Sequence, residues 1–408
     1  MNHGVRFWPP NVPLGTGVQW ALLRALAPPG FENPQLRPAK LGLTSASRLG
    51  LLPRIFARQP RELLRSELDD CFVTAYQQVH LLVARGLALE RTLQVVNDAA
   101  RSLSVRYVLL KGAAIMRHLQ TNLGLRGACD IDLLLFEPDA ARLHHELITR
   151  GYSLLTPTHP RHHLATLTDT QGNAIELHTE VPCFGLSATK RSVSVQDLVA
   201  HLQATPVSAL SDWALLPTRE FLVAHAVVHG IVQHGYSPKN YPLMRMLTDV
   251  SDLTNGNSNV DFNRIYSWVT PSVSSHELRA LLELSDALSH GRIEATWQRR
   301  DGVGRLLRHL VLGACDESYA NGLKLYNALH VFRTFGPRSF LREYGRATFA
   351  LPVEDLRHIY GSRAQGREFW FKLMRPIDVV RRVFTMLPGA GTVFARQLLG
   401  TLSTKNKD

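Results

Sequence analysis

The stretch "RYVLLKGAAIMRHLQTNLGLRGACDIDLLLF", residues 106–136, decides the fold of this chain. The apolar run at 105–110 predicts a short buried strand, and Lys111-Gly112 follows it as a turn that opens a helix. A second apolar run at 131–136 predicts another strand. The order of strand, turn, helix and strand indicates an α/β unit in which the two strands lie close together.

Two acids, Asp130 and Asp132, lie at the start of the second strand with one aliphatic residue between them. Side chains on a strand alternate between its two faces, so both carboxylates point the same way. They repel each other unless a cation lies between them. The apolar residues at 133–136 disfavour the alternative that the acids decorate a solvated edge strand. The pair therefore predicts a divalent-metal site.

The turn and the loop before the second strand carry groups suited to phosphate. Gly112 allows the backbone to approach a phosphate closely, and the helix after it presents free N–H groups. Lys111 adds a positive charge at the same place, and Arg126 in the return loop could bind phosphate oxygens. The GxxxxGK spacing of a P-loop is absent, and a glycine at such a turn often means only a tight turn.

A third carboxylate is required if two Mg²⁺ ions are to be held, because a nucleotide supplies only part of each coordination shell. The best candidate is Glu176 in "NAIELHTE", where Glu176 and His178 share one face of an expected strand. Ile175 and Leu177 occupy the other face. The alternative interpretation is that Glu176 lies on the outward face of an amphipathic strand, and we favour that alternative when the residue is taken alone.

The chain has 408 residues, a formal net charge of +12 and a pI near 9.8. Its length predicts two or three domains. The positive charge favours an anionic partner such as a nucleotide, a nucleic acid or a phospholipid surface. No zinc finger or aromatic RNA-binding signature accompanies the charge, so a diffusely basic surface is favoured over specific nucleic-acid binding.

The four cysteines form no CxxC pair, so neither a disulfide framework nor a thiolate zinc site is expected. Residues 1–15 lack the charged stretch and apolar core of a signal peptide. No run approaches the roughly 18 uninterrupted apolar residues of a transmembrane helix. We therefore expect a cytoplasmic protein without an integral membrane segment.

The sequence pattern predicts four parts. Residues 1–62 are rich in Pro and Gly and should form short helices, while 63–195 should form the α/β domain, preceded by two helices that Gly86 separates. Residues 196–350 should form a helical domain. Its periodic segments are 218–235, 241–254, 274–289 and 303–332. The expected fold class is α+β, with a small mixed sheet, flanking helices and a mostly helical C-terminal region.

The last part, 351–408, is a basic amphipathic tail in which aromatic residues alternate with Lys and Arg. Such a tail could make a peripheral contact with an anionic membrane. The alternative is a helix docked on the protein core with its arginine side chains reaching solvent. We favour docking because Pro376 and the Pro388-Gly389 break keep the segments short.

The run "LLKGAAIMRHLQTNLGLRGACDIDLLL", 109–135, resembles the signature of the DNA-polymerase-β-like nucleotidyltransferase superfamily, most closely that of the bacterial "uncharacterised nucleotidyltransferase" family. The resemblance implies that Asp130, Asp132 and Glu176 bind metal and are catalytic. It also implies a nucleotide-binding role for three further residues, Lys111, Gly112 and Arg126. The wider superfamily has Gly-Ser or Gly-Gly at the turn where this chain has Gly112-Ala113, so one hydroxyl contact to phosphate is missing.

A second stretch, "FLVAHAVVHGIVQHGYSPKNYPLMRMLTDVSDL" at 221–253, is similar to the helical region of the same family. Its polar positions are His225, His229, Arg245 and Asp249. The two histidines have the spacing of zinc ligands in HExxH, but alanine stands in the place of the Glu, so zinc is not expected. The histidines could equally bond within a cleft or satisfy the core, and Arg245 is expected to pair with Asp249 along a helix. His178, His229 and Arg245 are auxiliary site candidates.

The function that follows from the resemblance is Mg²⁺-dependent transfer of an NMP from an NTP, such as ATP, to an acceptor hydroxyl with release of pyrophosphate. Two Mg²⁺ ions are expected, with Mn²⁺ as the alternative ion. The acceptor, a small molecule, peptide or protein, is not identified by any motif. Two alternatives stay open: a catalytically silent relative that binds nucleotide or a macromolecule, and an RNA- or DNA-directed nucleotidyltransferase.

Overall fold

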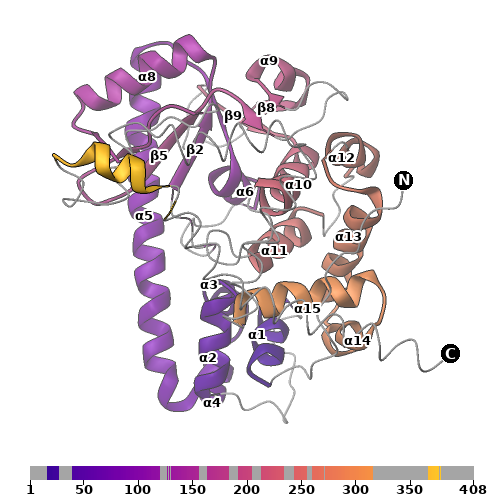
Figure 1. Ribbon diagram of the computed structural model, residues 1–408. Helices are drawn as coiled ribbons and strands as arrows, with labels where there is room; N and C mark the ends of the chain where they lie inside the picture. Colours follow the sequence, from indigo (N-terminus) through magenta and orange to yellow (C-terminus); the bar gives the residue numbers. More distant parts are fainter. Residues whose placement is uncertain are drawn as a thin grey trace. The chain divides into compact units, whose positions relative to one another are not determined.

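The structure is a computed structural model, and its description covers residues 16–26, 39–119, 126, 128, 130–155, 163–182, 192–204, 213–233, 243–254, 260–270, 272–315, 366–375 and 377 (Figure 1). The chain divides into two compact units. The sheet unit consists of 73–229 and 249–278, and the helical unit of 1–72, 230–248 and 279–408. Our boundaries at residues 62, 195 and 350 stay predictions.

A seven-stranded mixed sheet forms the centre of the sheet unit, in the order β3-β4-β5-β2-β1-β9-β8. Its strands are β1 (Tyr107–Leu109), β2 (Asp130–Leu134), β3 (Ser153–Leu154), β4 (Leu167–Thr168), β5 (Ala174–His178), β8 (Leu202–Ala204) and β9 (Ala214–Pro217). β6 (Val181–Pro182) and β7 (Ser192–Val193) form a separate ladder. β2 runs antiparallel to β1 and parallel to β5. The predicted α+β class and both predicted core strands are confirmed.

The pairing of β2 with β5 aligns polar residues with polar residues and apolar residues with apolar residues. Asp132 pairs with Glu176, and Leu133 pairs with Leu177. Partners in a parallel ladder point to the same face, so one face is acidic and the other apolar. Ile131, Leu133 and Leu177 are fully buried. Packing of this apolar face fixes the register, since a shift by one residue would turn the acids toward the apolar face.

Helices flank this sheet. α6 (Lys111–Leu119) contacts β2 and α10 (Arg219–Val228), which in turn contacts α12 (Phe262–Val269). α8 (Glu137–Thr149) contacts β5; it has a proline in its first turn and ends before Gly151, which has a positive φ of 96°. In the view of Figure 1, β2 and β5 lie between α8 and the pair α6 and α10. A short helix, α9 (Val195–Leu198), precedes β8.

Two expectations about these elements were wrong. α5 (Phe72–Ser102) is one continuous helix of 31 residues, so Gly86 does not separate two helices. A glycine inside a helix costs only about 1 kcal/mol relative to alanine, which the packing of a long helix offsets. β8 and β9 lie in a region expected to be wholly helical, because strands of three or four residues carry too little periodicity to be detected.

The helical unit includes α1 (Thr16–Leu26), α2 (Ala39–Arg48), α3 (Leu52–Arg58), α4 (Arg61–Leu68), α14 (Ile293–Gln298) and α15 (Gly302–Cys315). α1 contacts α2, α3 and α14. A buried ion pair between Arg24 and Glu67 joins α1 to α4, and Trp20 Nε1 donates to Glu67 Oε2 at 2.8 Å. α11 (Leu243–Thr254) and α13 (Ser275–Ser289) each include a boundary between the units.

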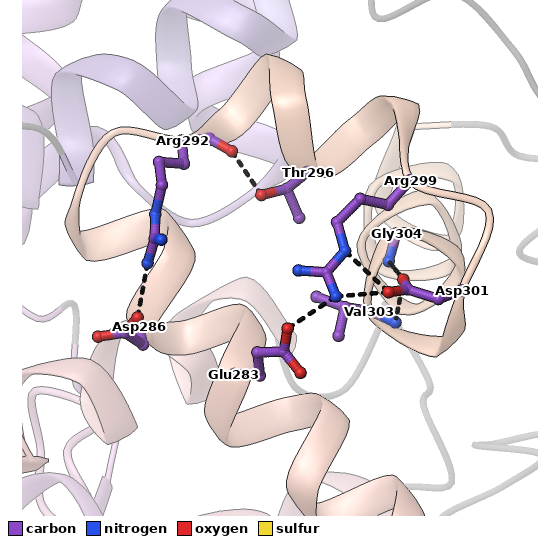
Figure 2. A network of polar contacts seen from close by, with 8 residues as sticks. All are labelled: Glu283, Asp286, Arg292, Thr296, Arg299, Asp301, Val303 and Gly304. Atoms are coloured by element: carbon purple, nitrogen blue, oxygen red, sulfur yellow. Dashed lines mark hydrogen bonds and ion pairs between the residues drawn. The ribbon is translucent and has the colours of Figure 1, made fainter.

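An exposed network of ion pairs links α13 to the turn that leads into α15 (Figure 2). Arg299 Nη2 lies 2.7 Å from Glu283 Oε1, and Arg299 Nε donates to Asp301 Oδ2 at 2.9 Å. Arg292 pairs with Asp286 at 2.6 Å. Asp301 Oδ1 also accepts from the first backbone N–H groups of α15, so this carboxylate caps the helix.

The described part of the C-terminal tail is 366–375 and 377, and residues 368–375 form a helix. Phe369, Trp370 and Leu373 are exposed there, at 75%, 62% and 58%. The rest of the tail lies outside the described residues, so both its docking on the core and its contact with a membrane stay predictions. None of the described helices combines the length and the apolar content that a bilayer crossing requires.

Candidate functional site

An acidic and histidine-bearing cluster lies on the polar face of β2 and β5. It contains Asp132 from β2 with Glu176 and His178 from β5. One ligand atom from each of the three side chains lies within 4.8 Å of the other two. The Asp132 side chain is only 2% exposed, while that of Glu176 is 25% exposed. The cluster is therefore buried at Asp132 and reachable from Glu176.

Lys111 places its ammonium between these carboxylates. Its Nζ lies 2.6 Å from Asp132 Oδ1 and 3.8 Å from Glu176 Oε2. Lys111 is the first residue of α6 and has a left-handed backbone, with a φ of 44°. A residue other than glycine in this region costs about 1–3 kcal/mol and persists only where the surrounding structure requires it. The strained turn therefore delivers a positive charge to the acidic face.

His178 bonds to the same carboxylate from the other side. Its Nε2 donates to Asp132 Oδ1 at 2.9 Å and lies 3.4 Å from Glu176 Oε2. The His178 side chain is 4% exposed, and the ring of His163 packs against it edge-on with 5.1 Å between the ring centroids. The imidazole is thus held in the cluster by its strand, by Asp132 and by a second aromatic ring.

The buried charges shift one another's pKa values. Burial alone would raise the pKa of Asp132, but the ammonium of Lys111 and the hydrogen bond from His178 hold it well below its ordinary value. Burial alone would lower the pKa of Lys111, but the charges of Asp132, Glu176 and Asp130 raise it. Burial would likewise lower the pKa of His178, and the hydrogen bond to Asp132 reverses that shift. Asp132 is therefore a carboxylate at neutral pH.

Asp130 shares the polar face of β2 but is not a member of the compact cluster. The negative charge of Asp132, followed by burial, raises the pKa of Asp130 to about 6. Asp130 is thus ionised at pH 7.5, and three carboxylates then face one ammonium and one imidazole. Negative charge is in excess even when His178 is protonated.

Arg126 lies against the glycine turn and is held there by an acid from α11. Its Nε donates to Asp249 Oδ1 at 2.8 Å and its Nη2 to Oδ2 at 2.5 Å. A Cβ atom on Gly112 would lie 2.6 Å from Arg126 Nη1. Glycine is therefore required for the guanidinium to approach the turn this closely. Asp249 thus pairs with Arg126, and its pairing with Arg245, expected from helical spacing, stays a prediction.

The remaining auxiliary candidates differ in their surroundings. His225 is buried in α10, and burial, followed by the charge of Lys111, lowers its pKa to about 3. His229 begins a π-helical turn (His229–Gln233), and its ring centroid lies 5.9 Å from that of His225. Arg245 belongs to the helical unit. The roles of His229 and Arg245 stay predictions.

The donors on β2 and β5 fit a divalent cation. Two carboxylates and an imidazole offer three ligand atoms at short mutual distances, and excess negative charge surrounds them. The ammonium of Lys111 lies in contact with both carboxylates, so a positive charge is already stabilised there.

Three features of this site could not be read from the sequence with certainty. The alignment of Asp132 with Glu176 depends on the register of strands 44 residues apart. The sequence shows that His178 shares a strand face with Glu176, but it does not show that His178 also lies beside Asp132. The ion pair between Arg126 and Asp249 joins residues 123 positions apart, and no local sequence pattern predicts it.

Comparison with known proteins bears on the same residues. The family profile described as "Uncharacterised nucleotidyltransferase" matches residues 42–289, which is more than half of the chain and includes β1, α6, β2 and β5. No curated protein and no solved structure matches the chain significantly. The suspected resemblance is confirmed: this chain belongs to the uncharacterised nucleotidyltransferase family.

Proposed function

We propose that this protein is a divalent-metal-dependent nucleotidyltransferase, which moves an NMP from an NTP to an acceptor hydroxyl and releases pyrophosphate. One observation carries the proposal: the parallel register sets Asp132 beside Glu176, next to the turn at Lys111 and Gly112. Carboxylates on one face beside a helix N-terminus suit a metal ion and a triphosphate at the same place.

The acidic face would bind and orient the reacting groups. Asp132 and Glu176 would hold the metal, with Asp130 as the neighbouring carboxylate expected from the family resemblance. A divalent ion supplies Lewis-acid stabilisation of the phosphoryl oxygens and lowers the pKa of a bound hydroxyl. Because Asp132 is buried and its oxygen is fixed by two hydrogen-bond donors, its position needs little reorganisation when substrate binds.

The turn would receive the phosphates. Gly112 lets the guanidinium of Arg126 lie against the turn, and the N-terminus of α6 presents backbone N–H groups beside it. The side chain of Lys111 could move so that its ammonium leaves Asp132 and contacts the pyrophosphate leaving group, where negative charge develops. Arg126, oriented by Asp249, supplies a second cation at the same turn.

The test is a labelling experiment with each α-labelled NTP, a divalent metal and a cell extract. We expect one NTP to label an acceptor, and Asp132→Asn to lower labelling at least about 100-fold because an essential metal ligand is removed. Asp286→Asn is the matched control, since it makes the same change in an exposed ion pair. Equal labelling by the wild type and Asp132→Asn would remove the assignment.

A second candidate is a silent relative that binds nucleotide without transferring it. Two observations favour it: Ala113 lacks the hydroxyl found in the wider superfamily, and Lys111 already pairs with Asp132. The discriminating measurement is thermal unfolding with ATP, GTP, CTP or UTP and a metal. A ligand at 100 times its Kd adds about 2.7 kcal/mol of stability. Stabilisation without any labelled product would favour this candidate.

A further inference from the structure

We propose that the metal subsite formed by Asp132, Glu176 and His178 takes a first-row transition-metal ion, with Mn²⁺ bound in preference to Mg²⁺, because one ligand is an imidazole nitrogen. The inference deepens the proposed function, on whose site it rests. It differs from the all-carboxylate set that the family resemblance implies, in which Asp130 takes the third position.

The strand geometry places His178, rather than Asp130, in the compact donor set. Glu176 and His178 are two residues apart on β5 and therefore share its polar face. Asp132 faces Glu176 through the parallel register. The Nε2 atom of His178 reaches both carboxylates, at 2.9 Å from Asp132 and 3.4 Å from Glu176. The same nitrogen can therefore be a ligand to an ion that both carboxylates hold.

The ammonium of Lys111 shows where a positive charge is stabilised in this cluster. Lys111 Nζ contacts Asp132 Oδ1 at 2.6 Å, which is the oxygen that also accepts from His178. An ion that replaces this ammonium would meet the carboxylates of Asp132 and Glu176 and the nitrogen of His178 together. Buried charges of one sign are stable only when paired, so displacement of Lys111 requires such an ion.

The chemistry of the donor set selects the ion. Mg²⁺ prefers oxygen ligands in strict octahedral geometry and gives up its water reluctantly. Imidazole is a ligand for transition metals, whose affinity for nitrogen rises from Mn²⁺ toward Cu²⁺. A site with two carboxylates and one imidazole therefore discriminates against Mg²⁺. The discrimination comes from His178 alone, because both carboxylates serve either ion.

The imidazole is also preoriented for this role. His178 is buried on a central strand, and the ring of His163 packs against it at 5.1 Å between centroids. His163 Nδ1 is in turn within 2.6 Å of the carbonyl oxygen of Leu164. Neighbours that fix the orientation of a ligating histidine strengthen metal binding.

The test is pulsed EPR of the full chain with substoichiometric Mn²⁺, without nucleotide. Electron spin echo modulation from a directly bound ¹⁴N nucleus should be present in the wild type and absent in His178→Asn. His145→Asn is the matched control, because His145 is an exposed histidine of α8, and it should keep the modulation. Absence of nitrogen modulation in the wild type, or its persistence in His178→Asn, would overturn the inference.

Equilibrium competition between Mn²⁺ and Mg²⁺ gives a second measurement. The ratio of the Mg²⁺ to the Mn²⁺ dissociation constant should fall at least about tenfold in His178→Asp, which restores an all-oxygen donor set. An unchanged ratio, or no Mn²⁺ binding to the wild type, would overturn the inference. Both readouts are independent of turnover: nitrogen-ligated Mn²⁺ without any nucleotidyl transfer would contradict the proposed function and support this inference.

Discussion

Two groups of charged side chains in this protein have similar composition and different surroundings. The exposed network of the helical unit contains three acids and two arginines, namely Glu283, Asp286, Asp301, Arg292 and Arg299. The acidic face of the sheet unit contains three acids, a lysine and a histidine, namely Asp130, Asp132, Glu176, Lys111 and His178. Side chains of the first group are 36–56% exposed, whereas Asp132 is 2% exposed.

The difference shows why one group is structural and the other is a candidate site. Water solvates the exposed charges, so an unpaired acid there costs little. In the buried group an excess negative charge cannot be solvated and must be neutralised by an ion or a proton. The pKa of Asp130 is raised for this reason, since the negative charge of Asp132 is the largest cause of the shift. Similar residues thus form a candidate metal site only where they are buried.

The largest expected difference in stability comes from removal of one cation from each group. Lys111→Met removes the ammonium that contacts the buried carboxylate of Asp132 and should lower the free energy of unfolding by about 3 kcal/mol. Arg292→Met should change it by less than about 1 kcal/mol. Urea denaturation without metal measures both. Saturating Mn²⁺ should restore part of the loss in Lys111→Met, and equal costs for the two substitutions would contradict the comparison.

A smaller effect is expected where an acid acts only through an arginine. Asp249→Asn keeps the shape of the side chain but weakens its hold on Arg126. The Kd for an NTP should rise about tenfold, equivalent to about 1.4 kcal/mol, because the guanidinium is no longer oriented at the turn. Calorimetric titration measures the Kd, and Asp286→Asn is the control. An unchanged Kd in a folded Asp249→Asn protein would exclude a positioning role.

The smallest expected effect is a dependence of stability on pH. The pKa of Asp130 is about 6 in the folded protein, above its ordinary 3.8, so the folded state holds this proton more tightly than the unfolded chain does. The resulting stabilisation is present at acidic pH and is lost as the pH rises through about 6. Without metal, Asp130→Asn should therefore gain about 3 °C in Tm over the wild type at pH 7.5, and about half as much at pH 5, which lies between the unfolded and folded pKa values.

The exposed group supplies the control for this pH dependence. Asp286→Asn makes the same substitution in an exposed ion pair and is compared with the wild type at the same two pH values. A Tm difference for Asp130→Asn that does not change between pH 5 and pH 7.5 would show that the charge of Asp132 does not act on Asp130.

Local sequence patterns predicted the central part of the fold well. β1, α6, β2 and β5 were all expected close to where the structure has them. Each is predicted by a run of apolar residues, by Gly or Pro at its ends, or by alternation of apolar and polar residues. The shorter strands β8 and β9 were not expected, since pairing within the sheet and not local preference stabilises them.

The candidate site was predictable in its residues and less so in its arrangement. The shared face of Asp130 and Asp132 follows from strand geometry alone. The alignment of Glu176 with Asp132, the contact of Lys111 with Asp132 and the pairing of Arg126 with Asp249 depend on how distant segments meet. Such contacts are set by tertiary packing, so one sequence can suggest the participants but not their partners.

The most direct test of the central claim is an equilibrium Mn²⁺-binding isotherm for the wild type, Asp132→Asn and Asp286→Asn. Both substitutions remove one negative charge, and only the first removes it from the buried face. The account predicts that Asp132→Asn weakens Mn²⁺ binding at least about tenfold while Asp286→Asn binds as the wild type does. Equal binding by all three proteins would contradict the claim that the buried acidic face is a metal site.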